Sequence, residues 1–212
     1  MMCRMTQRAR SVTAKQERER AILDAAGALA AERSVREVTL TDIAAAVGLH
    51  KSAMLRYFET REQIFLLITA EAWQEWSVAV REALAVADRD DVPAILARSF
   101  VSRPVFCDLL GQAPMNLERN VSLDAVHRFK TIVLGEVAAV RESLRQLGIS
   151  EHGAALLTTT GASMAGALWQ MAAPGTQLRE FYQSHPDLGH AVVDVEPQLT
   201  DILTAILNGT AS

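Results

Sequence analysis

The sequence has few of the residues that interrupt regular structure, since only 6 of its 212 residues are proline and 11 are glycine. Alanine, leucine, glutamate, arginine and glutamine, which favour helices over strands, are abundant. The chain shows no persistent strand pattern and no internal repeat. These absences predict an all-α protein built from long helices.

Cysteines and long apolar runs are also scarce. The two cysteines, Cys3 and Cys107, belong to no motif, so neither a disulfide nor a thiolate metal site is expected, and a reducing cytoplasm fits. No apolar run reaches the roughly 18 uncharged residues that a membrane span needs. No apolar stretch follows the basic N-terminus, which argues against a secretory signal.

The sequence patterns of common enzyme classes are missing too. The chain has no G-x-S-x-G, no H-E-x-x-H, no phosphate-binding loop and no dinucleotide-binding fingerprint. His185 and His190 lie on either side of Asp187, in a composition more typical of a solvated loop than of a metal site. We therefore expect no catalytic residue, no cofactor and no metal ion.

Charges are unevenly distributed along the chain. Residues 1–61 hold 11 Lys and Arg against 7 Asp and Glu, whereas residues 62–212 hold 10 against 18. A basic first part is suited to a polyanion, although ordinary variation of surface charge is the alternative. Residues 1–14 are polar, basic and without periodicity, which predicts a flexible arm. This arm and Lys15 would bind DNA phosphates or a minor groove, unless the arm is simply a solvated tail.

Residues 15–61 have the pattern of a small helical domain. Apolar residues at helical spacing predict a first helix over residues 15–32, followed by a connector over residues 33–38. In the run T-L-T-D that follows, Thr39 has the character of an N-cap, with Asp42 three positions on as in a capping box. A second helix is therefore expected to begin after Thr39.

A tight turn separates this second helix from a third. Gly48 is expected to end the second helix in a left-handed conformation, and residues 50–58 have the apolar spacing of the next helix. Two short helices joined by such a turn are typical of a helix-turn-helix, although an ordinary helical hairpin has the same spacing. The positions expected to be exposed on the third helix are polar, basic or small: His50, Lys51, Ser52, Leu55 and Arg56.

The residue pattern favours the helix-turn-helix, because residues 15–66 resemble the signature of the TetR (tetracycline-repressor-like) family. The matching pieces are T-L-T-D-I-A-A-A-V-G at 39–48, K-S-A at 51–53, R-Y-F at 56–58 and T-R-E-Q-I-F at 60–65. Many fixed spacings agree at once, which makes the resemblance specific. Residues 103–122 also resemble, more weakly, the ligand domain of one TetR subgroup.

The resemblance implies a role for individual residues on DNA. It implies phosphate contacts from Thr39 or Thr41, base-edge and phosphate contacts from His50, Lys51 and Ser52, backbone contacts from Arg56 and Tyr57, and a phosphate clamp from Arg61. The chain departs from the family pattern at Leu55, where a tyrosine is usual and where leucine is suited to a thymine methyl group. It departs again at His50, a poorer cap than Ser or Thr, and in lacking a glycine before Thr39.

Residues 62–212 are expected to form a second, helical domain that binds an effector and forms the dimer. Capping residues, breakers and apolar periodicity predict helices over residues 60–86, 92–102, 104–112, 122–148, 151–172 and 195–208. Pro114 is expected to bound a loop, and residues 176–194 are expected to form a polar loop or a broken helix.

Apolar and adaptable side chains of this domain are candidates for lining an effector pocket between the fourth helix and the helices after residue 92. Core packing is the alternative for each of them. The candidates, with two polar residues among them, are Trp73, Trp76, Phe100, Phe106, Leu110, Asn116, His127, Met164 and Trp169.

The last two predicted helices are candidates for a dimer interface. The resemblance implies a four-helix interface between two copies, and small residues at three- and four-residue spacing let helices approach closely, although internal packing explains them as well. The candidates are Ala154, Thr158, Gly161, Ala165, Leu199, Ile202, Leu203 and Ile206.

Together these features predict a cytoplasmic, homodimeric repressor that binds a palindromic operator in double-stranded DNA. A small, largely apolar effector would shift the fourth helix, change the separation of the two recognition helices and release the operator. The alternative is a helical protein-interaction module that has lost DNA binding.

Overall fold

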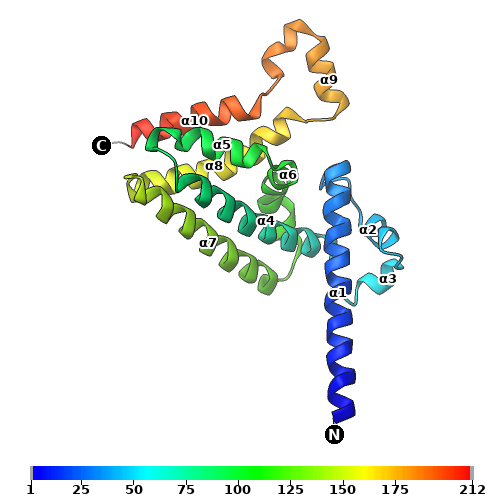
Figure 1. Ribbon diagram of the computed structural model, residues 1–212. Helices are drawn as coiled ribbons and strands as arrows, with labels where there is room; N and C mark the ends of the chain where they lie inside the picture. The colour runs from blue at the N-terminus through cyan, green and yellow to red at the C-terminus, as the bar shows by residue number, and fades with distance from the viewer. Residues whose placement is uncertain (1, 211–212) are drawn as a thin grey trace.

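The computed structural model describes the backbone of residues 2–210 and the side chains of residues 13–210, and within that range it contains helices and no strand. Figure 1 shows α1, α2 and α3 to one side of a larger layered body formed by the later helices. In chain order the helices are α1 (Met2–Glu32), α2 (Leu40–Ala46), α3 (Lys51–Met54), α4 (Arg61–Leu84), η1 (Arg89–Asp91), α5 (Val92–Val101), α6 (Pro104–Gln112), η2 (Ala113–Leu117), η3 (Glu118–Asn120), α7 (Leu123–Gln146), α8 (Glu151–Ala172), α9 (Gln177–Ser184), η4 (Pro186–Ala191) and α10 (Val195–Gly209).

The first helix is longer than expected. Residues 2–14, predicted to be an irregular arm, form the first part of α1, which projects beyond α2 and α3 (Figure 1). The physical reason is that no proline or glycine precedes Gly27, so nothing in the sequence ends the helix. The arginine side chains of the predicted arm lie outside the described side chains, and their DNA contacts stay a prediction. Lys15 pairs with Glu19 one turn later, at 3.6 Å.

The predicted face of α1 packs on the helix-turn-helix. Ile22 and Ala26 on α1 are fully buried, and they belong to one apolar core with Ile43 of α2 and Met54 of α3. Phe58, just after α3, is also buried in this core. These contacts hold α2 and α3 on a fixed base, which leaves the opposite side of α3 free.

The later helices pack in pairs. The closest associations join α4 to α7, α6 to α8, and α5 and α8 to α10, and Figure 1 shows α4 and α7 running alongside each other. At one point α6 and α8 touch backbone to backbone, because a Cβ placed on Gly166 would lie 2.6 Å from the backbone nitrogen of Gly111. No helix within residues 2–210 is long and apolar enough to cross a membrane.

One segment predicted as a loop is helical, and so is another predicted as a polar loop or a broken helix. The segment around Pro114 is a short π-helix, η2, in which the proline takes one of the first two positions, where it needs no backbone hydrogen bond. Residues 176–194 contain α9, which begins at the N-cap Thr176, and η4, so the broken helix is the correct alternative. Conversely, the third helix ends at Met54, and residues 55–57 form a turn before Phe58.

Candidate nucleic-acid interface

The N-terminus of α2 is fixed by the capping box expected from T-L-T-D. The backbone nitrogen of Asp42 donates to Thr39 Oγ1 at 3.2 Å, and the backbone nitrogen of Thr39 donates to Asp42 Oδ2 at 2.9 Å. The hydrogen bonds from Thr39 lower the pKa of the Asp42 carboxyl, and the charge of Arg33 adds to the effect. The Thr39 hydroxyl also donates to Asp42, so it is already engaged in the cap, whereas Thr41 is exposed.

The turn between α2 and α3 depends on one glycine. Gly48 has φ +66°, a left-handed conformation that suits glycine, and the nitrogen of Leu49 then donates to the carbonyl of Ala44 at 2.8 Å. His50 is the N-cap residue of α3 and makes no side-chain capping hydrogen bond. This agrees with the expectation that His50 is a poor cap, and it leaves the imidazole on the surface.

The outward face of α3 and the turn after it is polar and basic. Lys51, Ser52 and Arg56 are exposed beside His50, while Met54 on the opposite side is fully buried. Leu55 is the apolar member of this face, with 57% of its surface exposed, and Tyr57 is half-buried. The structure therefore places five of the residues assigned to DNA contacts at exposed positions in or beside α3: His50, Lys51, Ser52, Leu55 and Arg56.

Arg61 differs from the expected phosphate clamp. Its guanidinium donates to the carbonyl oxygens of Val35 and Val38, pairs with Glu62 at 2.9 Å and lies over the Phe65 ring at 4.7 Å. Only 14% of its side chain is exposed. Arg61 thus links the start of α4 to the connector before α2, because its charged guanidinium donates hydrogen bonds to connector carbonyls that are not part of a helix.

Sequence reasoning missed a second contact to the same connector. The backbone nitrogen of Val35 donates to Asp108 Oδ2 at 2.6 Å, and Gln170 Nε2 donates to Asp108 Oδ1 at 2.7 Å. Asp108 is a buried acid on the otherwise apolar helix α6. The available signal was an aspartate inside the apolar run V-F-C-D-L-L.

Four predicted effector-lining residues form one buried aromatic cluster. Trp76 stacks on Phe100 with ring centroids 4.6 Å apart, and Trp73 meets Trp76 and Phe106 edge-on, each at 5.3 Å. The Trp76 indole nitrogen donates to Ser99 Oγ at 2.9 Å. The cluster joins α4, α5 and α6, and its own rings fill the space between them.

The other predicted lining residues lie outside this cluster of rings. Leu110, Met164 and Trp169 pack against the edge of the common core. His127 is exposed on α7, and Asn116, on η2, accepts two hydrogen bonds from Asn120 Nδ2 at 2.8 and 2.9 Å. The assignment of these residues to an effector site stays a prediction.

Cys107 lies next to Asp108, and its thiol is buried. Burial, helped by the charge of Asp108, raises the pKa of the Cys107 thiol to about 12. The thiol donates to the carbonyl of Phe100 at 3.2 Å. It is therefore a packing residue without thiolate chemistry, and the side chain of Cys3 lies outside the described side chains.

Most predicted dimer residues lie inside the protomer. The small stripe on α8 faces α5 and α10 of the same chain, since a Cβ on Gly161 would lie 3.3 Å from Phe100 and 3.7 Å from Leu203. The internal-packing alternative therefore holds for the buried members Ala154, Thr158, Gly161, Ala165, Leu199 and Leu203. Periodicity identified a shared face correctly but did not show which neighbour covers it.

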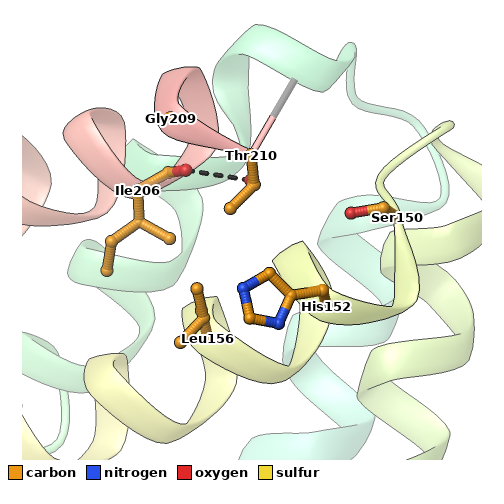
Figure 2. Close-up of a pocket in the computed structure, with 6 residues that line it drawn as sticks. All are labelled: Ser150, His152, Leu156, Ile206, Gly209 and Thr210. Atoms are coloured by element: carbon orange, nitrogen blue, oxygen red, sulfur yellow. Dashed lines mark hydrogen bonds between the residues drawn. The ribbon is translucent and has the colours of Figure 1, made fainter. Parts of the chain in front are cut away.

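A different face of the same two helices remains uncovered. Ile202 and Ile206 are only partly buried, and the outward residues beside them are small or apolar: Leu156, Ser163, Ala167 and Met171 on α8, and Ala205 and Gly209 on α10. Figure 2 shows the groove at one end of this face, where His152 and Leu156 of α8 lie opposite Ile206 of α10 and Thr210, the residue that follows α10.

Solved structures with the same fold include several regulators. PfmR from Thermus thermophilus, a TetR family transcriptional regulator, is 22% identical, with a TM-score of 0.54 over 88% of this chain and 93% of that one. Thermus thermophilus FadR in complex with lauroyl-CoA is 16% identical, with a TM-score of 0.58 over 92% and 95%. Bacillus subtilis FadR in complex with stearoyl-CoA is 15% identical, with a TM-score of 0.53 over 87% and 97%. At these identities the likeness shows the fold.

Family models give a more specific result. The model described as bacterial regulatory proteins, tetR family, matches residues 22–68, and the model described as tetracyclin repressor-like, C-terminal domain, matches residues 70–212. A comparison with curated proteins finds no match. Because the two models together cover the helix-turn-helix and the whole helical body after it, the chain belongs to the TetR family of transcriptional regulators, which are DNA-binding proteins and not enzymes.

Proposed function

We propose that the protein is a cytoplasmic, homodimeric repressor that leaves its operator when a small, largely apolar effector binds. The observation that carries the proposal is the surface formed by α3 and its flanking residues, where His50, Lys51, Ser52 and Arg56 are exposed while Met54 on the other side of the helix is buried in the core. A helix that reads the major groove must be held firmly on its buried side and must present polar and basic side chains on its exposed side.

Lys51 offers the sharpest test of this surface. Replacing Lys51 with alanine should weaken binding to DNA about tenfold and reduce the slope of log K against log salt by about one, because one phosphate contact is lost. The measurement is a fluorescence-anisotropy titration, at several salt concentrations, of duplexes enriched from a random pool by the wild-type protein. Lys130→Ala removes the same charge from α7 and should leave both quantities unchanged. Equal effects of the two substitutions would contradict the assigned face.

Two-fold symmetry is part of the proposal, because paired recognition helices read a palindrome. The outward residues on the uncovered face of α8 and α10 are small or apolar, and a second copy of the chain suits them. The buried stripe behind it keeps the two helices together within each protomer. The proposed dimer face therefore includes Ile202 and Ile206 of the predicted residues and lies away from the buried members of that set.

Adjacent residues of α10 test the dimer face. Ala205 lies on the uncovered face and Thr204 is exposed on the other side of the helix. Ala205→Glu should convert the protein to a monomer, because it places paired like charges in an apolar interface, whereas Thr204→Glu should leave a dimer. Sedimentation velocity measures both. A monomeric Thr204→Glu protein, or a dimeric Ala205→Glu protein, would refute this face.

The effector proposal is supported by the aromatic cluster and by the fold neighbours. The two FadR regulators are bound to acyl-CoA molecules, whose long chains are apolar. In this chain an apolar molecule would displace Trp73 or Phe106 and move α4, which begins at the DNA-binding domain. Lauroyl-CoA is a reasonable first probe for release of bound DNA, alongside apolar molecules without the nucleotide. Unchanged DNA affinity with every probe at saturation would argue against the sensor half of the proposal.

One observation favours the alternative of an interaction module without DNA binding. Leu55 is a large, exposed apolar side chain in the centre of the proposed reading face, where a protein partner would also bury it. Salt dependence separates the two, because DNA binding weakens steeply with salt and burial of an apolar face does not.

A further inference from the structure

The peptide groups of Val35 are held from two directions. The nitrogen of Val35 donates to Asp108 on α6 at 2.6 Å, and its carbonyl accepts from the guanidinium of Arg61 at the start of α4. Val35 lies in the connector directly before the capped start of α2. A displacement of Val35 would therefore be carried into the helix-turn-helix.

Asp108 links this connector to the interior of the C-terminal domain. Its second oxygen accepts from Gln170 Nε2 on α8 at 2.7 Å, and only 6% of the residue is exposed. One carboxylate thus joins three segments that are far apart in the sequence. A buried carboxylate is costly unless donors surround it, so both hydrogen bonds are strongly favoured once it is buried.

The spacing of α6 and α8 is fixed beside Asp108. Gly111 lies one turn after Asp108 on α6, and Gly166 lies one turn before Gln170 on α8. The two glycines touch through their backbones, since a Cβ on Gly166 would lie 2.6 Å from Gly111 nitrogen and 2.9 Å from the carbonyl carbon of Leu110. A side chain at position 166 must push α6 away from α8.

We propose that Asp108 is a positioning residue through which the α6–α8 spacing sets the place of the connector, and hence the orientation of the helix-turn-helix. The inference rests on the proposed function, because it supplies a route from the effector domain to the DNA-binding surface. The route passes through the carboxylate of Asp108 and the peptide group of Val35. It is separate from the direct connection of the two domains through the helix α4.

The experiment changes the spacing between α6 and α8 and follows the amide resonance of Val35 by NMR. In 15N-valine-labelled full-length protein, Gly166→Ala should shift the Val35 amide resonance, whereas Gly135→Ala on α7, where a Cβ meets nothing within 4 Å, should not. Asp108→Leu removes both acceptors and should speed hydrogen exchange of that amide at least about tenfold. In the Asp108→Leu background, Gly166→Ala should no longer move the Val35 resonance. Should Gly166→Ala fail to fold, Gln170→Leu replaces it, with Gln146→Leu at an exposed glutamine of α7 as its control.

Affinity for DNA supplies the functional reading of the same variants. Asp108→Leu should weaken binding to the enriched duplex about tenfold, and Asp108→Asn, which keeps an oxygen for Val35, should restore it to near the wild-type value. Unchanged Val35 exchange in Asp108→Leu, or a Gly166→Ala shift that persists without Asp108, would overturn the inference. Wild-type protein that binds no DNA would instead refute the proposed function, while the Val35 measurements would still decide whether Asp108 positions the connector.

Discussion

Replacement of Trp76 with alanine should lower the free energy of unfolding by about 3–5 kcal/mol. Trp76 is fully buried, stacks on Phe100 at 4.6 Å, meets Trp73 edge-on at 5.3 Å and donates to Ser99. The substitution removes the largest fully buried side chain and leaves a space bounded by α4 and α5, which close packing cannot fill without shifting both helices. Urea denaturation followed by circular dichroism measures the loss.

The same helix provides a control for this prediction. Val78 is 48% exposed two residues further along α4, and Val78→Ala should change the free energy of unfolding by less than about 0.5 kcal/mol. Trp76→Phe, which keeps an aromatic ring beside Phe100, should be intermediate. A loss below about 1 kcal/mol for Trp76→Ala would mean that the cluster is loosely packed, contrary to the ring distances.

Replacement of Arg61 with alanine should cost about 2–4 kcal/mol of the free energy of unfolding, because it leaves the carbonyls of Val35 and Val38 without their charged donor. It should also weaken DNA binding, since the connector and α2 lose their tie to α4. Arg61→Lys should restore little, because one ammonium group cannot span two carbonyls as the planar guanidinium does. Urea denaturation and anisotropy titration on the same samples separate the two effects.

Arg56 is the matched control for Arg61. Its side chain is exposed at the end of α3, so Arg56→Ala should leave stability within about 0.5 kcal/mol and still weaken DNA binding. The two arginines therefore distinguish a positioning role from a direct phosphate contact. Arg61→Ala could instead leave the free energy of unfolding unchanged and reduce the salt slope as Lys51→Ala is expected to do. Arg61 would then be the phosphate contact that the family pattern implies.

Local signals in the sequence predicted the elements closely. The helices expected after Thr39 and over residues 60–86, 122–148 and 151–172 do begin there, and Thr39, Thr60, Ser122 and Ser150 are N-caps whose side chains accept a backbone hydrogen bond. Gly48 has the expected left-handed conformation. These features depend on atoms only a few residues apart, so they are readable from the order of the residues.

Features that depend on distant partners were not readable in this way. The small residues around Gly161 lie on one face of α8 as expected. That face packs against α5 and α10 of the same chain, which periodicity does not reveal. Arg61 was recognisable as basic, yet its partners, Val35 and Val38, are fixed only by the fold. The hydrogen bond from Val35 to Asp108 spans 73 positions, so only the unexpected acid in an apolar helix marked it.

In the proposed complex, a dimer presents the exposed face of α3 twice and reads a palindromic site. The most direct measurement is a titration of wild-type protein against an enriched inverted-repeat duplex and its scrambled counterpart over a range of salt. We expect saturation at two chains, or a multiple of two, per duplex, an affinity that falls steeply with salt, and at least about 1000-fold preference for the inverted repeat. Equal affinity for the two duplexes, or binding insensitive to salt, would contradict this proposal.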